Sequence, residues 1–301
     1  MRENLVFLVL LAGACAKGGS LGADANGGDD DGSDAPSRDR DGPSDIDGPT
    51  DIDSPTQIDS PPTSGPHLLL TEVVLQPTGG EFIEIGNPTN AAVDLEHYYL
   101  SDNGNYFNTP SNSVTVDSSD FIAHFPAGAS IAAGGVVTVA MDVASNFQTA
   151  YATAPSYSVA SHTMVVVSST GTPTLTNTGE PIVLFYWDGQ SDLVKDVDLL
   201  ICGVPTSTNL LVDKSGLGVD GPDTGSTPSN YGADAMTIAA QASAPGSGFS
   251  TKRIAPETGH EHQSGTGNGI TGDDETSEDT SATWDTTFTA PTPGTVPSGL
   301  L

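Results

Sequence analysis

Large apolar side chains are rare between residues 16 and 66 but recur throughout residues 67–301. A chain folds only where it buries enough apolar surface to offset the conformational entropy that it loses. Asp, Gly, Ser and Pro dominate the first segment, so we expect residues 15–66 to form a disordered acidic linker. The folded domain is expected over residues 67–301.

The linker contains a six-residue repeat, GPSDID, GPTDID and SPTQID, over residues 42–59. Proline at every sixth position disfavours helix, and repulsion between the aspartates extends the chain further. We therefore expect this segment to act as a stalk that separates the folded domain from the N-terminus.

The N-terminus is typical of an exported protein. An apolar run, Leu5–Leu11, precedes the small residues of Ala12–Ala14 and then Cys15. The run is too short to cross a bilayer but suits the core of a signal peptide. The segment that ends in Cys15 resembles the bacterial lipobox. The resemblance implies that residues 1–14 are removed by cleavage after Ala14 and that lipid on Cys15 holds the protein at a membrane. Ala16 stands where Asp signals retention at the inner membrane, so the resemblance implies the outer membrane or the cell surface.

The charge is strongly one-sided, with 39 acidic residues against 8 Lys and Arg and a formal net charge of -31. Such a chain repels phosphate backbones, which argues against a nucleic-acid partner. Gly216–Gly221 fits the G-x-G-x-x-G pattern, but Pro222 follows, and no helix can open there to hold a dinucleotide. The sequence contains no Walker-type loop, H-E-x-x-H or C-x-x-C motif. We expect no enzymatic activity.

Short apolar or alternating runs separated by turn residues dominate the folded part and predict an all-β antiparallel sandwich. In Glu81–Ile85 the alternation assigns Phe82, together with Ile83 and Ile85, to an inward face. A hairpin turn is predicted at Asp188–Gly189. The predicted strands cover residues 68–75, 81–85, 92–100, 122–125, 136–141, 164–167, 182–187 and 193–201.

Several of these segments together resemble the lamin-tail domain family. The resemblance rests on LTEV at 70–73, GEFIEIGNPT at 80–89, VDL at 93–95, YLSD at 99–102, FPAG at 125–128, TGEPIVL at 178–184 and TPG at 292–294. It implies an immunoglobulin-like β-sandwich. The chain departs from the family pattern by long insertions at 106–120, 143–162 and 204–250 and by an acidic loop after His260.

The acidic loop carries the candidate metal ligands. Its densest group of carboxylates consists of Asp273, Asp274, Glu275, Glu278 and Asp279. Hard oxygen ligands in a loop suit Ca²⁺, while the alternative is a solvated acidic loop with no cofactor. A zinc site on His260-Glu261-His262 is a further alternative, although a zinc ion needs more ligands than this tripeptide supplies.

Other residues with chemical potential are expected to be structural. Glu72, Glu81 and Glu84 lie on predicted strands, where we expect them to hydrogen-bond backbone groups. Cys202 is expected to be a small buried side chain at the end of a strand.

These observations predict a lipid-anchored, non-catalytic binding or structural module of the adhesion type. Its loops, where the insertions lie, would contact an unknown protein or polysaccharide. The alternative is a calcium-dependent accessory module that binds carbohydrate or protein and assists a separate secreted hydrolase.

Overall fold

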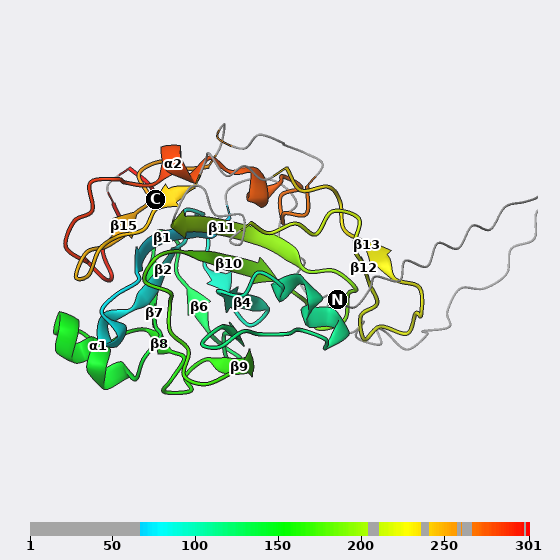
Figure 1. Ribbon diagram of the computed structural model, residues 1–301, viewed down its shortest axis with the longest axis horizontal. Helices are drawn as coiled ribbons and strands as arrows, with labels where there is room; N and C mark the ends of the chain where they lie inside the picture. Colours follow the sequence, from blue (N-terminus) through cyan, green and yellow to red (C-terminus); the bar gives the residue numbers. More distant parts are fainter. Residues whose placement is uncertain (1–66, 204–210, 236–240, 258–259, 261–266, 298) are drawn as a thin grey trace, which may run out of the picture. The chain divides into compact units, whose positions relative to one another are not determined.

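Two β-sheets enclose an apolar core that takes side chains from both (Figure 1). The computed structural model describes residues 67–203, 211–235, 241–257, 260, 267–297 and 299–301. Within them, the predicted all-β sandwich with long loop insertions is confirmed. The expected signal peptide and linker, residues 1–14 and 15–66, lie outside the described residues, so both stay predictions.

The first sheet has five strands in the order β15-β1-β2-β7-β8. Its strands are β1 (Leu69–Val74), β2 (Phe82–Gly86), β7 (Val136–Ala140), β8 (Tyr157–Ser158) and β15 (Thr251–Lys252). The second sheet has six strands in the order β14-β11-β10-β4-β5-β9. Its strands are β4 (Tyr98–Ser101), β5 (Phe121–His124), β9 (Val165–Ser169), β10 (Glu180–Tyr186), β11 (Lys195–Gly203) and β14 (Ala242–Ser243).

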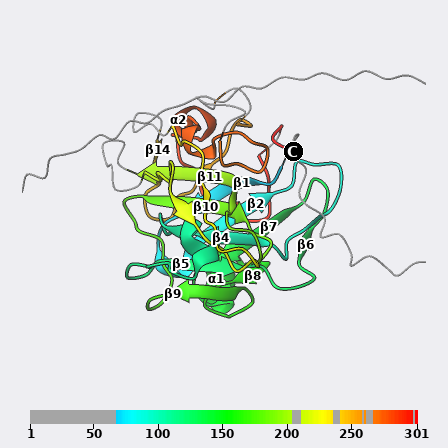
Figure 2. The ribbon, with the colours of Figure 1, turned by 90° about the vertical axis from the view of Figure 1, so that its right-hand side faces the viewer.

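Two short ribbons and a few helical turns complete the described elements. The ribbons pair β3 (Val93–Asp94) with β6 (Ser130–Ile131), and β12 (Gly218–Val219) with β13 (Ser229–Asn230). The helices are α1 (Ala144–Tyr151) and α2 (Thr280–Thr283), with the 3-10 turns η1 (Thr78–Gly80), η2 (Tyr106–Ser111) and η4 (Glu275–Ser277). No helix in the described ranges is long and apolar enough to cross a membrane. In Figures 1 and 2, α2 lies beside the end of β11.

Both sheets are also covered on their outer faces, which the alternating pattern alone did not predict. On the five-stranded sheet, Phe82 packs with Val74, Ala140 and Phe147 of α1. The assignment of Phe82 to the same inward face as the two isoleucines is therefore wrong. Ile83 and Ile85 line the core between the sheets, and successive side chains of a strand point to opposite faces.

The insertions supply the cover of the six-stranded sheet. Tyr106 and Phe107 of η2 and Val212, Val219 and Tyr231 of the later insertion pack on its outer face. As a result, all residues of β10 are buried. This explains why β10 reads as a continuous apolar run rather than an alternating one.

A β-bulge in β11 decides where two aspartates point. Asp198 pairs with Leu184 and Asp196 pairs with Phe185, so Val197 is an extra residue on β11. Leu184 faces the core between the sheets, while Phe185 faces the outer cluster. The bulge therefore places Asp198 and Asp196 on opposite faces of the sheet, although residues two apart in a regular strand share one face.

Candidate binding cleft

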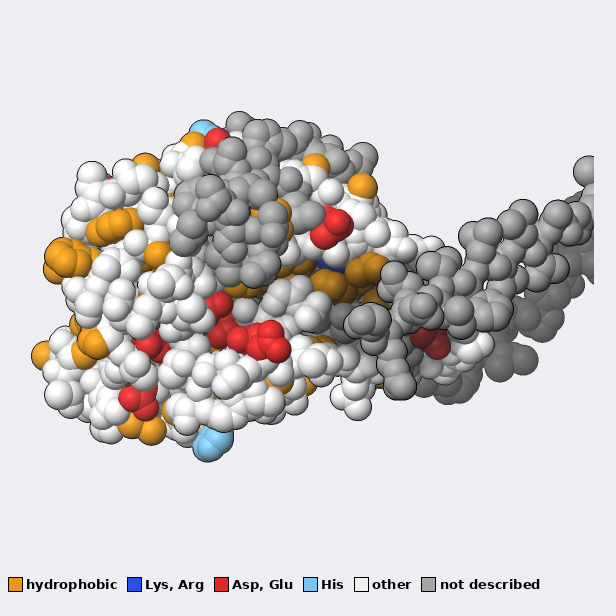
Figure 3. Space-filling view, viewed as in Figure 1, with side chains coloured by type: hydrophobic (Ala, Val, Ile, Leu, Met, Phe, Trp, Pro, Cys, Tyr) orange, Lys and Arg blue, Asp and Glu red, His pale blue; other side chains and the backbone are white. Residues whose placement is uncertain are grey.

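A cleft of about 470 Å³ opens where β11 begins. The turn between β10 and β11, the insertion that carries β12 and β13, and the segment 267–269 line it. The lining residues are 191–195, Asp223, Ser229, Tyr231 and 267–269. On the face of the molecule shown in Figure 3, Asp and Glu side chains are much more visible than Lys or Arg.

One wall of the cleft is fixed by Asp192. The backbone N–H of Gly221 donates to Asp192 Oδ1 at 2.8 Å, while the Ser229 hydroxyl and N–H donate to Oδ2 at 2.6 and 3.1 Å. These hydrogen bonds, that of the Ser229 side chain first, lower the pKa of Asp192 and keep the carboxylate ionised. Gly221 must be glycine here, because a Cβ atom would lie 2.7 Å from the carbonyl oxygen of Ser191.

Tyr231 connects the cleft to the outer cover of the sheet. Its hydroxyl accepts a hydrogen bond from the Val194 N–H at 3.0 Å and donates to the Phe107 carbonyl at 2.8 Å. Its ring packs edge-to-face on Phe107, with centroids 5.9 Å apart. Burial raises the pKa of Tyr231, so this phenol is a neutral structural group.

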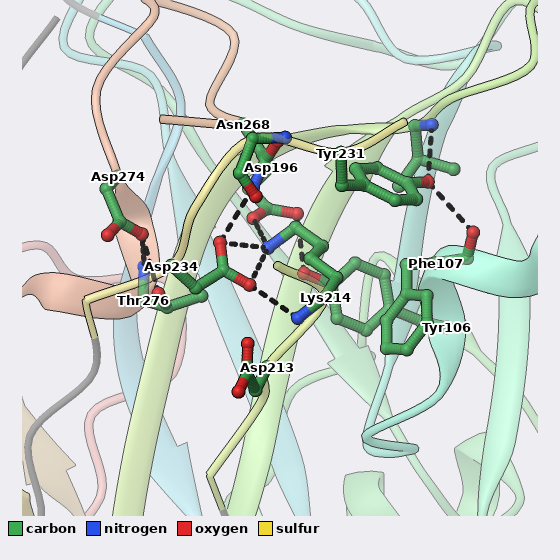
Figure 4. Close-up of polar contacts among 12 residues, drawn as sticks. Tyr106, Phe107, Asp196, Asp213, Lys214, Tyr231, Asp234, Asn268, Asp274 and Thr276 are labelled. Carbon is green, nitrogen blue, oxygen red and sulfur yellow. Dashed lines mark hydrogen bonds and ion pairs between the residues drawn. The ribbon is translucent and has the colours of Figure 1, made fainter. Parts of the chain in front are cut away.

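A buried lysine network lies next to the cleft (Figure 4). Lys214 is fully buried, and its Nζ lies 2.6 Å from Asp196 Oδ2 and 3.1 Å from Asp234 Oδ1. The Tyr106 hydroxyl donates to Asp196 Oδ1 at 2.5 Å, and the amide of Asn268, a lining residue, donates to Asp234 Oδ1 at 2.7 Å. Burial lowers the pKa of Lys214, but the charges of the two aspartates outweigh it, and the net pKa is raised. Lys214 therefore stays charged and holds the insertion against β11.

A second buried network lies on the opposite face of β11, around Arg253. Its guanidinium donates to both oxygens of Asp198 at 2.6 and 2.7 Å and to Glu278 Oε1 at 2.8 Å. Arg253 Nε donates to the carbonyl of Leu70 at 2.8 Å, and the guanidinium lies 5.1 Å from the centre of the Trp284 ring. The arginine thereby links β1, β11 and the C-terminal segment.

The acidic loop is not the solvated segment that was the alternative to a metal site. Asp274, Glu275 and Glu278 are buried. Glu278 pairs with Arg253, and Asp274 Oδ2 accepts from the N–H of Ala235 at 2.6 Å, so two of these carboxylates stabilise the fold.

The five predicted carboxylates do not gather around one point. In the described part of the chain, no three of Asp273, Asp274, Glu275, Glu278 and Asp279 bring ligand atoms within 4.8 Å of one another. Glu275 instead joins His67 and Glu257, and Glu278 joins Asp198 and Glu257. A third group, Asp192 with Asp220 and Asp223, lies beside the cleft.

The glutamates of the predicted strands and Cys202 can be compared with the roles predicted for them. The structural role of the strand glutamates is confirmed: Glu72 accepts from Thr292 N–H, Glu81 from Leu175 N–H and Glu84 from Gly294 N–H. Cys202 is free and buried, as expected. Ala14, Cys15, Glu261 and His262 lie outside the described residues, so the lipidation site and the histidine pair stay predictions.

The residues that build the two networks were missed at the sequence level. The available signal was the scarcity of basic residues, because only Lys195, Lys214, Lys252 and Arg253 follow position 66. A lysine or arginine in so acidic a domain is a strong candidate for a buried ion pair. The pattern Asp196-Val197-Asp198 inside an apolar strand was the second signal.

The fold and the cleft together define a β-sandwich module with its candidate site in the loops at the start of β11. The family model of the Lamin Tail Domain matches residues 61–199. This match confirms the resemblance to the lamin tail domain family over that part of the chain. The match ends inside β11, so Lys214, Tyr231 and Arg253 lie beyond it.

A solved structure similar to this chain is that of a DUF4876 family protein from Bacteroides thetaiotaomicron VPI-5482. The two share 14% sequence identity over 78% of this chain and 75% of that one, with a TM-score of 0.38. No curated protein matches the sequence.

Proposed function

We propose that this protein is a non-catalytic binding module, held at the outer membrane or cell surface by lipid on Cys15, that takes a protein or polysaccharide ligand in the cleft beside β11. The observation that supports it best is the way the cleft is built. Two of its walls come from the insertion that carries β12 and β13 and from the loop after His260, and the insertion is tied to the sheet through buried groups such as Lys214 and Tyr231. Binding sites are commonly loops held by such a scaffold.

The polar groups of the cleft favour binding over catalysis. The carboxylate of Asp192 and the hydroxyl of Tyr231 are already used in hydrogen bonds that hold the loops together. Lys195 and Asp223 are exposed at the rim and are available to a ligand. A panel of esterase, nuclease and glycosidase substrates tests this point, and turnover that depends on a cleft residue would contradict it.

Binding is tested with rim variants of the full chain. We expect Lys195→Ser and Asp223→Asn to weaken retention on polysaccharide fractions or intact cells without lowering the melting temperature. Lys252→Ser, which lies away from the cleft, is the matched control. Equal retention of all three variants and the unmodified chain would rule out this cleft as the site.

A calcium-dependent version of this function is the second candidate. Asp192, Asp220 and Asp223 offer oxygen atoms within 4.8 Å of one another at the cleft, and Ca²⁺ prefers carboxylate oxygens. On this hypothesis, Ca²⁺ raises the melting temperature by several degrees and is needed for retention on carbohydrate. Asp223→Asn abolishes both effects, whereas a melting temperature insensitive to Ca²⁺ argues against this version.

The anchor requires its own test. Cells that express the full chain are labelled with a palmitate analogue, and we expect the label on the mature protein. Cys15→Ser is expected to remove it. Labelling that survives this substitution would refute lipidation at Cys15.

A further inference from the structure

Six ionisable side chains lie close together where β1 begins, and Arg253 forms ion pairs with only two of them. Arg253 binds Asp198 and Glu278 through its guanidinium, at 2.6 and 2.8 Å. Those two carboxylates thus have a cation of their own. His67, Glu257 and Glu275 form the other side of the same buried cluster.

This second side is buried but incompletely paired. His67 Nε2 lies 2.5 Å from Glu257 Oε1, and the two side chains are only 9% and 8% exposed. Within the described residues, His67 Nδ1 has no hydrogen-bond partner, and Glu257 Oε2 and Glu275 Oε2 have none unless one of these two carboxyls is protonated and donates to the other. Glu275 itself is 1% exposed. Buried polar atoms without partners are rare in folded proteins and require an explanation.

The charges of the cluster also do not balance. Its four carboxylates, Asp198, Glu257, Glu275 and Glu278, face one guanidinium and one imidazole, so the net charge is −2 even if His67 is protonated (−4 + 1 + 1). A buried cluster of this kind must take up protons or a further cation. Burial, and after it the neighbouring carboxylates, raise the pKa of Glu275 well above its usual range.

We propose that His67, Glu257 and Glu275 form a binding site for a divalent transition-metal ion of the zinc type. Each residue offers one ligand atom, and these atoms lie within 4.8 Å of one another. One imidazole nitrogen with two carboxylate oxygens is a donor set that zinc accepts, whereas Ca²⁺ and Mg²⁺ take oxygen ligands. Ligand atoms around a tetrahedral zinc ion lie about 3.3 Å apart, so side-chain rotations suffice to close the site.

The position of the three ligands indicates what the ion does. His67 precedes β1, Glu257 follows β15, and Glu275 opens η4. An ion held by all three cross-links the first strand of the sandwich to the C-terminal segment, beyond the region matched by the family. None of the three ligands lines the cleft, although Glu275 lies next to the lining residue Gly269, and the site does not depend on the proposed binding function.

The test uses the untagged full chain, stripped of metal by a chelator. We expect calorimetry to show tight binding of one Zn²⁺ per chain and a higher melting temperature with Zn²⁺ than with equal concentrations of Ca²⁺ or Mg²⁺. Glu275→Gln, which keeps the shape of the side chain, is expected to lower zinc affinity at least 10-fold, and His67→Gln likewise. Glu96→Gln, at an exposed carboxylate outside the cleft and the buried cluster, is the control and is expected to bind zinc normally.

The comparison of Zn²⁺ with Ca²⁺ and Mg²⁺ uses the unmodified chain and does not depend on how the variants fold. The absence of zinc binding, equal stabilisation by all three cations, or an affinity unchanged by both ligand substitutions would overturn the proposal.

Discussion

Replacing Arg253 by methionine is expected to destabilise the sandwich strongly and in a pH-dependent way. Methionine keeps the apolar stem beside Trp284 but removes the cation that Asp198 and Glu278 share. Arg253 and Asp198 are fully buried, and the distances between the charged groups are 2.6–2.8 Å. Removing one partner of such a buried pair costs about 3–5 kcal/mol, because it leaves an uncompensated charge in a region of low polarity.

The pH dependence follows from the two carboxylates that remain. Burial already raises the pKa of Asp198 to about 7 and raises that of Glu278 while Arg253 is present, and the loss of the guanidinium raises both further. An acid whose folded pKa is raised binds a proton more readily in the folded state, so the folded state loses stability as pH rises. Each such group changes the free energy of unfolding by at most about 1.4 kcal/mol per pH unit. We therefore expect the deficit of Arg253→Met to be about 4 kcal/mol at pH 7.5 and to shrink by about 1–2 kcal/mol at pH 5.5.

Urea unfolding followed by tryptophan fluorescence, in the presence of a chelator, measures this deficit at both pH values. The neighbouring Lys252→Met is the matched control. Lys252 is 15% exposed and lies 3.6 Å from Glu72, which keeps its hydrogen bonds from Thr292, so its loss is expected to cost less than that of Arg253, about 1–2 kcal/mol. Equal deficits for the two variants, or a deficit for Arg253→Met that does not change with pH, would refute the reasoning.

Three further predictions follow from single residues. Burial raises the pKa of Asp102 from 3.8 to about 9, so the carboxyl is protonated in the folded state and destabilises it increasingly as the pH rises from about 4 to 9. Urea titrations between pH 5 and 8 are expected to show that Asp102→Asn gains stability relative to the unmodified chain as the pH rises, and a constant difference would contradict this. Burial also raises the pKa of the Cys202 thiol to about 12. In the Cys15→Ser variant we therefore expect a thiol reagent to label Cys202 only after denaturant unfolds the domain, and prompt labelling of the native protein would contradict this expectation. Gly221→Ala, whose Cβ would lie 2.7 Å from a backbone oxygen, is expected to lower the free energy of unfolding by about 1–3 kcal/mol. Gly104→Ala, which has open space around it, is expected to change that free energy by less than about 0.5 kcal/mol, and similar values for the two variants would contradict the steric argument.

The strands could be predicted from the sequence because each is a short apolar run bounded by turn residues. Residues 122–125 and 136–141 were assigned as strands within one residue of β5 and β7. The hairpin at Asp188–Gly189 was also correct, since β10 and β11 pair as antiparallel neighbours. Local patterning carries this information.

The outer cover and the charge networks could not be predicted in the same way. The face on which Phe82 lies depends on α1, an element that a sequence pattern for a sandwich does not contain. The partner of Lys214 is 18 residues away in sequence at Asp196, and that of Arg253 is 55 residues away at Asp198. Such pairings are set by the tertiary fold, and nothing local to either residue identifies its partner. For the same reason, the acidic loop was read as one group, although its members serve different neighbours.

Because Val197 is an extra residue, β11 holds two different parts of the chain. Asp196 on one face binds Lys214 of the insertion, and Asp198, two positions further on, binds Arg253 of the C-terminal segment on the other face. A change in the pairing of β11 would release both at once. We therefore expect the loops around the cleft and the closing segment of the chain to be lost together on unfolding, as a single cooperative unit, rather than to detach one after the other.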